Sequence, residues 1–150
     1  MIRNSVTLLQ YSGYLLVIGL ASTFYNAANG EVGFNKHGVT GLYACGGSAI
    51  LIFLFGWLTG KGKDWAAWAG LGLAFMLMSF GGYKLFTLMK GLDLNVADLV
   101  KQRAAAGEIL TDEAAKNSIL YRAGIFGALF FFSMWTFLKL GTALRRSKTT

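Results

Sequence analysis

The sequence predicts an all-α protein, a polytopic membrane bundle of four transmembrane helices with an amphipathic surface helix. Of its 150 residues, 55% are hydrophobic and only 14% are charged, whereas soluble domains carry about 25% charged residues. Four uncharged apolar runs approach the roughly 20 residues that a helix needs to cross the hydrocarbon core. The chain contains no proline, so nothing forces a break in such helices.

The apolar runs locate the spans, which we expect within a single membrane domain covering residues 1–150. The expected spans are residues 8–25, 39–58, 65–83 and 119–140. The fourth run is the shortest, and Arg122 and Lys139 complete it if their charges reach the headgroups. The runs are continuous rather than alternating, which excludes the strands of a membrane barrel.

The first run has an alternative interpretation as a signal peptide. Against this, only Arg3 precedes the run, Gln10 and Ser12 interrupt it, and no clear cleavage site follows before Asn26. We therefore expect an uncleaved first span.

Four spans place both termini on one side of the membrane, named side A here, and the opposite side is named side B. Lys and Arg divide equally, seven to each side, so the positive-inside rule does not orient the chain. Asp64 is the only acid expected on side A, which leaves net charges of about +6 on side A and +1 on side B. A basic tail on side A would favour anionic cytoplasmic lipids. We therefore expect side A to be cytoplasmic, or to face the matrix or stroma of an organelle.

The predicted lipid-interface residues also belong to side A. Tryptophan gathers at membrane–water interfaces, and basic residues interact there with anionic headgroups. The residues expected at this interface are Trp57, Trp65, Trp68, Trp135, Arg145 and Arg146.

The polar connector at about residues 92–118 is expected to hold the amphipathic helix. Its apolar stripe consists of Leu92, Val96, Leu99 and Val100. Asp93 or Asn95 can cap this helix and Gly107 stops it. Thr111 then caps a second helix that can run without a break into the fourth span. We expect the stripe to lie along the membrane surface or to dock a partner.

Residues 99–114 also resemble the short C-terminal oligomerisation module of bacterial membrane proteins. The shared features are a leucine-bearing helix, Gly107 and the segment Thr111–Asp112–Glu113. Any helix, glycine stop and capped helix produces the same pattern, because capping selects those residues. We favour this second interpretation.

Residues that could carry chemistry are scarce. No Asp, Glu, Lys, Arg or His lies in the centre of an expected span, although proton relays and ion-coupled transport usually rely on such groups. One Cys and one His exclude an intrachain disulfide and are too few for a Cys/His zinc site. We expect Cys45 to be a buried hydrophobe and His37 to be interfacial, since a haem would need a second His from another chain. We therefore predict no enzyme activity, cofactor, metal or nucleic-acid partner.

Small residues at four-residue spacing are the positive signal in the sequence. Such residues let helix backbones approach closely, which is how helices associate in lipid. Some pairs arise by chance in a chain with 20 Gly, but their recurrence on three spans favours a tight bundle. The predicted helix-packing residues are Gly41, Cys45, Ala49, Gly56, Gly60, Ala66, Gly70, Ala74, Gly124 and Gly127.

The order of short motifs resembles the transmembrane protein 14 family of small four-helix membrane proteins, which includes plastid fatty-acid exporters. The matching motifs are Ser12-Gly-Tyr-Leu-Leu, Gly41-Leu, Gly46-Gly47, the turn Lys61–Asp64 and Tyr121-Arg-Ala-Gly-Ile. The family's Met-Pro-Ala-Gly at the last helix lacks its proline here, and residues 92–120 are an insertion. The resemblance implies passive export of a lipid, fatty acid or small hydrophobic metabolite.

Two functions therefore follow as expectations. The first is a non-catalytic accessory or assembly subunit that packs against other membrane proteins or against copies of itself, with membrane lipids around it. The alternative is the passive transporter that the resemblance implies.

Overall fold

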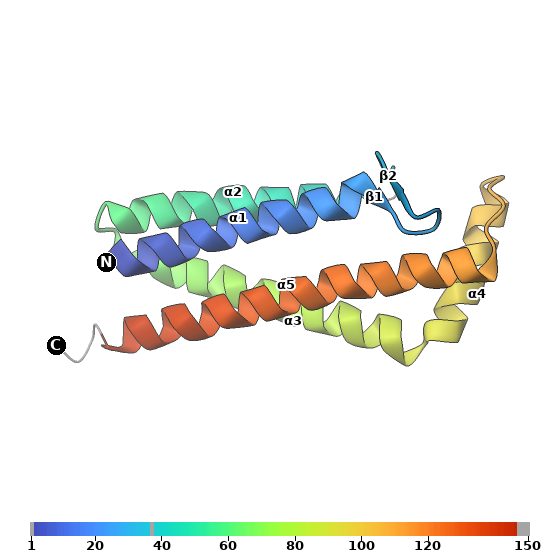
Figure 1. The fold of residues 1–150 in the computed structure, drawn as a ribbon. Coiled ribbons are helices and arrows are strands. Elements are labelled where there is room, and N and C mark those ends of the chain that lie inside the picture. The colour runs from blue at the N-terminus through green and yellow to red at the C-terminus, as the bar shows by residue number, and fades with distance from the viewer. Residues whose placement is uncertain (1, 37, 147–150) are drawn as a thin grey trace.

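The computed structural model describes residues 2–36 and 38–146, which form five α-helices and one two-stranded sheet (Figure 1). In chain order these elements are α1 (Ile2–Phe24), β1 (Tyr25–Asn26), β2 (Glu31–Val32), α2 (Val39–Gly60), α3 (Asp64–Lys90), α4 (Leu92–Ala105) and α5 (Asp112–Arg146). All but α4 of the helices are long and apolar enough to cross a membrane. The all-α fold with four candidate spans is thereby confirmed, and it indicates a multi-pass membrane protein. His37 lies outside the described residues.

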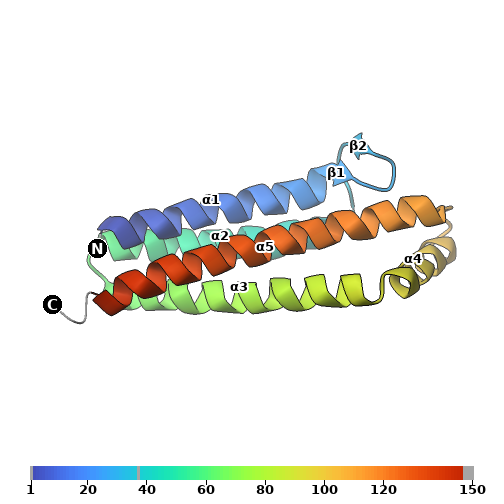
Figure 2. The ribbon, with the colours of Figure 1, turned by 60° about the horizontal axis from the view of Figure 1, so that its bottom comes forward.

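The four long helices lie side by side and alternate in direction (Figures 1 and 2). One antiparallel pair is α1 with α2, and the other is α3 with α5. The start of α1, the turn between α2 and α3, and the end of α5 share one end of the bundle, which we call end A. The β-hairpin and α4 lie at the opposite end, end B (Figure 1). Ends A and B correspond to the predicted sides A and B.

The turn at end A is short because glycine allows a reversal within three residues. Gly62 has φ +82°, a conformation that side chains disfavour. Its N–H donates to the carbonyl of Thr59 at 3.0 Å, and the N–H of Lys63 donates to that of Leu58 at 3.1 Å. These bonds satisfy the last carbonyls of α2 before α3 begins at Asp64.

At end B, two helices run well past their apolar segments. We placed the end of the third span at residue 83, but α3 continues to Lys90. Thr111 accepts a hydrogen bond from the N–H of Ala114 at 3.2 Å, and α5 then runs for 35 residues without a break, as predicted. A helix of this length measures about 52 Å, against a hydrocarbon core of about 30 Å. Consequently α5 extends beyond α1 and α2 at end B (Figures 1 and 2).

The apolar stripe of α4 has a neighbour within the chain. Leu99 is buried against Ala115 and Ile119 of α5, with Val96 and Val100 packed beside it. The extended first turns of α5 thus supply the apolar cover that we expected from lipid or a partner.

The cap of α4 differs from the prediction. Gly91 occupies the N-cap position and makes no side-chain cap bond. Instead of capping α4, Asn95 donates its amide to the carbonyls of Thr87 and Leu88, at 3.3 and 3.2 Å. This side chain therefore closes the end of α3, where carbonyls lack helical partners. Gly107, with φ +78°, ends the α4 segment as expected.

The loop between the first two spans contains a β-hairpin that the sequence did not reveal. Tyr25 pairs with Val32, and Asn26 pairs with Glu31. Asn26 also turns the chain through its side-chain oxygen, which accepts the N–H of Ala28 at 3.3 Å, and Gly30 takes φ +69°. Strands of two residues carry no periodic pattern, so this hairpin had no signal in the sequence.

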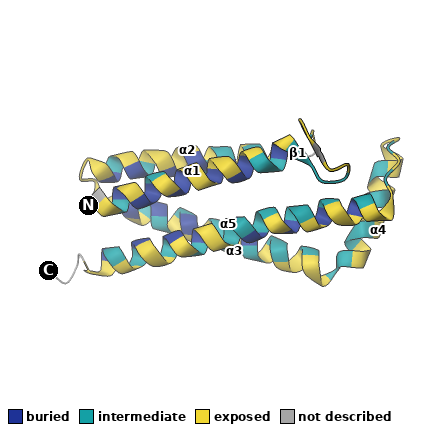
Figure 3. Cartoon of the chain, in the orientation of Figure 1, coloured by how far each residue is buried: buried dark blue, intermediate teal, exposed yellow. Residues whose placement is uncertain are grey.

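The core lies along the axis where the four long helices meet (Figure 3). Leu8, Tyr11 and Leu15 of α1 are fully buried, as is Ile52 of α2. Leu140 joins them from α5. The outward faces of all four helices remain exposed and largely apolar (Figure 3), which matches helices surrounded by lipid.

Two glycines of α3 provide a matched test of this packing. A Cβ at Gly81 would lie 3.0 Å from the backbone N of Phe130 and 3.1 Å from the carbonyl O of Phe126, whereas one at Gly72 would meet nothing within 4 Å. We expect Gly81→Ala to destabilise the bundle by about 1–3 kcal/mol, because backbone atoms of α5 cannot give way easily. Gly72→Ala should be neutral or stabilising by up to about 1 kcal/mol. Thermal unfolding in detergent, followed by circular dichroism, measures both, and equal effects would contradict the close approach of α3 and α5.

Candidate functional site

The small residues of α2 face α1 along most of its length. Cys45 and Ala49 are buried, and a Cβ at Gly56 would lie 3.1 Å from the side chain of Leu9. A Cβ at Gly41 would come within 2.5 Å of the hydroxyl of Ser22. The seam also carries polar contacts, since Ser5 donates to the carbonyl of Gly56 at 2.7 Å.

The ends of this seam show which features we missed. At end A, a Cβ at Gly60 would meet the hydroxyl of Ser5 at 3.0 Å. Towards end B, Gly19 of α1 packs against Cys45 of α2. A Cβ added at Gly19 would lie 3.2 Å from the Cβ of Cys45. Before α2 begins, a Cβ at Gly38 would lie 1.8 Å from the carbonyl O of Ser22. Neither Gly19 nor Gly38 has a glycine or alanine four residues away, so the four-residue spacing did not select them.

The predicted small residues of α3 face the centre of the bundle. Ala66 and Ala74 are fully buried. A Cβ at Gly70 would lie 2.6 Å from the side chain of Leu8, so this glycine makes room for the buried leucine of α1. These three positions therefore join α3 to the other helix pair.

On α5 the prediction is corrected at one position. Gly127 is buried, and its nearest neighbour is Leu85 of α3. Gly124 is exposed, and an added Cβ would meet nothing within 4 Å, so it packs no helix of this chain. The contact with α3 instead uses Gly81 and Gly82 against Phe130. Gly81 and Gly82 are adjacent rather than spaced by four, so the four-residue spacing did not select them.

Three of the four tryptophans lie at end A. Trp57 lies in the last turn of α2, and the ammonium group of Lys61 is 3.7 Å from the centroid of its ring. Trp65 packs edge-on against Phe55 with centroids 6.3 Å apart, and Trp68 is one turn further along α3. Trp135 differs, because it precedes the end of α5 by 11 residues and is exposed on the bundle's side rather than at its end.

The basic residues predicted for the same interface lie at the end of α5. Arg145 and Arg146 form its last turn and are exposed at end A. Cations in this position also interact favourably with the negative end of the helix dipole.

A polar pair lies in the middle of the core. Ser133 of α5 donates to the carbonyl of Leu129 at 2.5 Å. The hydroxyl of Tyr11 lies 2.5 Å from the same serine oxygen. Because the serine proton already has an acceptor, Tyr11 acts as the donor to Ser133. Both residues are fully buried, so this bond ties α1 to α5 where water is absent.

An ion cluster joins two distant loops at end B. The carboxylate of Glu108, between α4 and α5, accepts hydrogen bonds from the ammonium group of Lys36 at 2.6 Å and from the guanidinium group of Arg103 at 2.5 Å. These two hydrogen bonds, together with the charges of the same residues, lower the pKa of Glu108 to about 2. Lys36 belongs to the segment between β2 and α2, so the cluster connects the α1–α2 loop to the α4–α5 loop.

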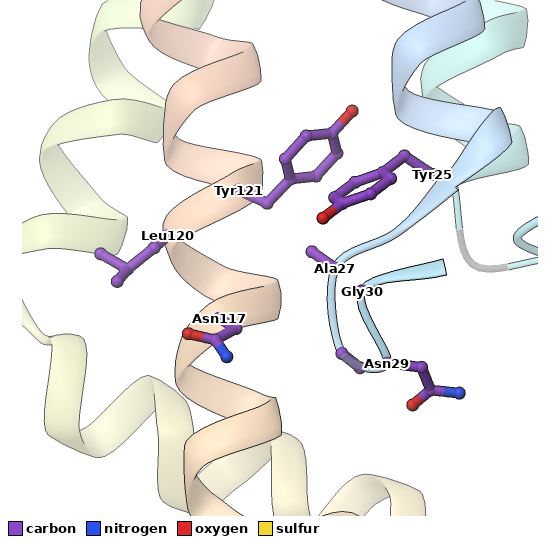
Figure 4. A pocket seen from close by; sticks show the side chains of 8 residues that line it. Tyr25, Ala27, Asn29, Gly30, Asn117, Leu120 and Tyr121 are labelled. Carbon is purple, nitrogen blue, oxygen red and sulfur yellow. The ribbon is translucent and has the colours of Figure 1, made fainter. Parts of the chain in front are cut away.

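An open pocket of about 530 Å³ lies at end B, between the hairpin and α5 (Figure 4). The rings of Tyr25 and Tyr121 face one another at its inner end, with centroids 4.9 Å apart. Tyr121 also donates to the carbonyl of Ala21 at 2.7 Å, which fixes α5 to the last turn of α1. Asn117 lies on the α5 wall and Asn29 on the hairpin turn (Figure 4). All eight lining side chains are uncharged.

No catalytic constellation stands out among these residues. Within residues 2–36 and 38–146, no three His, Cys, Asp or Glu side chains come together as metal ligands. The thiol of Cys45 is buried between α1 and α2. The distinctive groups of the described structure are therefore the packed seams, the Tyr11–Ser133 pair and the charged cluster at end B.

The Tyr11–Ser133 bond is testable by a double-mutant cycle. We expect Tyr11→Phe to cost about 0.5–1.5 kcal/mol of unfolding free energy, the usual worth of one hydrogen bond. Ser133→Ala should cost about 1–3 kcal/mol, because it leaves a buried phenol without an acceptor. The double variant should lose less than the sum of the two. Chemical unfolding in mixed micelles measures all three, and strict additivity would show that the two side chains do not interact.

The Glu108 cluster predicts a pH dependence of the end-B loops. A carboxylate whose pKa is lowered in the folded protein stabilises the fold above its unfolded pKa. That contribution declines as pH falls below about 4.5 and is lost as pH passes about 2. The carbon-13 shift of the Glu108 carboxyl should therefore titrate near pH 2. In Lys36→Gln its midpoint should move upward, and an unchanged midpoint would mean that Lys36 does not bind Glu108 in solution.

Comparison with known proteins gives no relative for this arrangement. No family model matches the chain, and neither a curated protein nor a solved structure is significantly similar to it.

Proposed function

We propose that this chain is a non-catalytic subunit of a membrane assembly, packing against other membrane proteins or against a second copy of itself. The observation that supports the proposal most is the outward face of α3. Only 11% of the most apolar window of α3 is buried within the chain, compared with 44% for α1. Of the four long helices, α3 is therefore the one that the rest of the described chain covers least.

The composition of this face favours a protein neighbour over lipid. Gly72 and Ser79 are exposed on it, next to the large side chains of Met76 and Tyr83. Positions 72, 76, 79 and 83 recur at helical spacing and so share one side of α3. A glycine between large side chains leaves a hollow that a neighbouring helix can enter, and a serine hydroxyl can bond across such a contact.

The placement in the membrane belongs to the same proposal. End A is assigned to the cytoplasm, or to the matrix or stroma of an organelle. Arg145 and Arg146 would meet anionic headgroups there, and Trp57, Trp65 and Trp68 would lie at the level of the headgroups. The exposure of these side chains at end A supports this placement.

The alternative, passive export of a lipid or small hydrophobic metabolite, stays a prediction. Tyr11, Ile52 and Leu140 fill the centre of the bundle. A substrate that crossed between the helices would therefore have to separate α1 from α5. The test is the flux of a fatty acid into proteoliposomes that contain the protein. A flux that is faster with Tyr11→Phe than with the wild type would support this alternative over the subunit role.

The subunit proposal is tested by substitutions that fill the α3 face. We expect Gly72→Leu to reduce the partner, or the second copy, recovered in mild detergent by about tenfold, as a clash of 1.4 kcal/mol or more would. Gly13→Leu is the matched control, since Gly13 is likewise exposed on a long helix with nothing within 4 Å. Cross-linking in native membranes followed by mass spectrometry measures the recovery. A monodisperse monomer with no cross-linked neighbour would refute the proposal.

A further inference from the structure

Arg122 lies where α5 leaves the bundle at end B. The preceding residue, Tyr121, donates its hydroxyl to the carbonyl of Ala21 in the last turns of α1. The 23 residues of α1 measure about 34 Å, close to the thickness of a hydrocarbon core of about 30 Å. If α1 spans the membrane, its end lies at the headgroups, and so does Arg122.

The side chain of Arg122 belongs to the inward face of α5. Residues 115, 129 and 133 share this face at spacings of seven and eleven, and all three are buried. Leu120, two residues earlier, is exposed on the outward side, but Arg122 is partly buried. We expected Arg122 to extend along lipid with its charge at the surface. In the structure its side chain is partly buried and lies near Arg103 of α4.

Among the described residues, no opposite charge pairs with Arg122. Arg122 forms no ion pair or hydrogen bond with another described residue, and it lies close enough to Arg103 for their like charges to repel. Glu108, the carboxylate of this cluster, is held by Arg103 and Lys36. A partly buried guanidinium without an opposite charge is costly, because desolvation is not repaid.

We propose that Arg122, with Arg103 near it, binds a phosphate group at end B. The planar guanidinium donates two parallel hydrogen bonds to phosphate oxygens, and an oxyanion would offset both the desolvation and the repulsion between the two arginines. Two sources carry this chemistry. One is an anionic phospholipid, whose phosphate lies at the depth of Arg122, and the other is a free phosphate that enters from the aqueous side.

The test uses the full chain in phosphate-free detergent micelles, with thermal unfolding as the readout. Phosphatidylglycerol should raise the Tm of the wild type, whereas a galactolipid, which has no phosphate, should not. Inorganic phosphate is the third arm: stabilisation by phosphatidylglycerol alone assigns the lipid source, and equal stabilisation by inorganic phosphate assigns the free one. No stabilisation by either would overturn the proposal.

Variants locate the site. Arg122→Gln should weaken phosphatidylglycerol binding by roughly tenfold or more, the worth of a charge-assisted hydrogen bond. Lys116→Gln is the control, because it removes one exposed positive charge from the same helix and should change binding less than twofold. Undiminished binding by a folded Arg122→Gln would refute the assignment.

A second variant separates binding from folding. Arg122→Met keeps a long side chain but removes the charge. Without phosphate or lipid phosphate, it should raise the Tm above that of the wild type, because it removes an uncompensated charge. Added phosphatidylglycerol should then reverse the order of the two proteins. A lower Tm of Arg122→Met in the phosphate-free micelles would show that Arg122 already has a stabilising partner within the chain, and would overturn the proposal.

Discussion

The close approach of helix backbones is the constraint on which the rest of this structure depends. Lipid tails are as apolar as leucine, so burying a side chain between two helices in a bilayer gains little from the hydrophobic effect. Dispersion contacts must hold the helices together, and these decay within a fraction of an ångström. Gly56 and Gly70 therefore meet the side chains of α1 directly, and Gly81 meets the backbone of α5. The two helix pairs and their common core follow from these contacts.

The same shortage of water dictates how the polar groups of the bundle are satisfied. Thr59 and Thr23 donate to carbonyls one turn earlier in their own helices. Each hydroxyl is thereby hydrogen-bonded without needing a group from another helix. Tyr11 cannot reach its own backbone, so its hydroxyl crosses to Ser133. One polar bond between helices thereby specifies which side of α1 faces α5, whereas apolar contacts alone would tolerate rotation.

End B follows different rules because α5 emerges there into a more polar environment. The first turns of α5 carry α4, whose Leu99 is buried in a second, smaller core. Charged groups gather at the same place, with Glu108 joining loops that are 72 residues apart in the chain. A rigid apolar bundle thus presents a polar, partly charged end, and both the pocket beside Tyr121 and the proposed phosphate site belong to this end.

The sequence by itself determined the long helices and α4, and tertiary structure decided their partners. Uncharged runs predicted four spans, and local chemistry predicted the Gly107 stop, the Thr111 cap and the continuous α5, because capping depends only on nearby residues. The apolar stripe of α4 was visible in the sequence. Its cover by α5 was not, because it depends on how far α5 extends past the bundle. Gly124 and Gly81 show the same limit, since spacing does not tell which side of a helix meets a neighbour. The bond between Tyr121 and Ala21 of α1 joins residues 100 apart in the chain, and no local pattern encodes such an interaction.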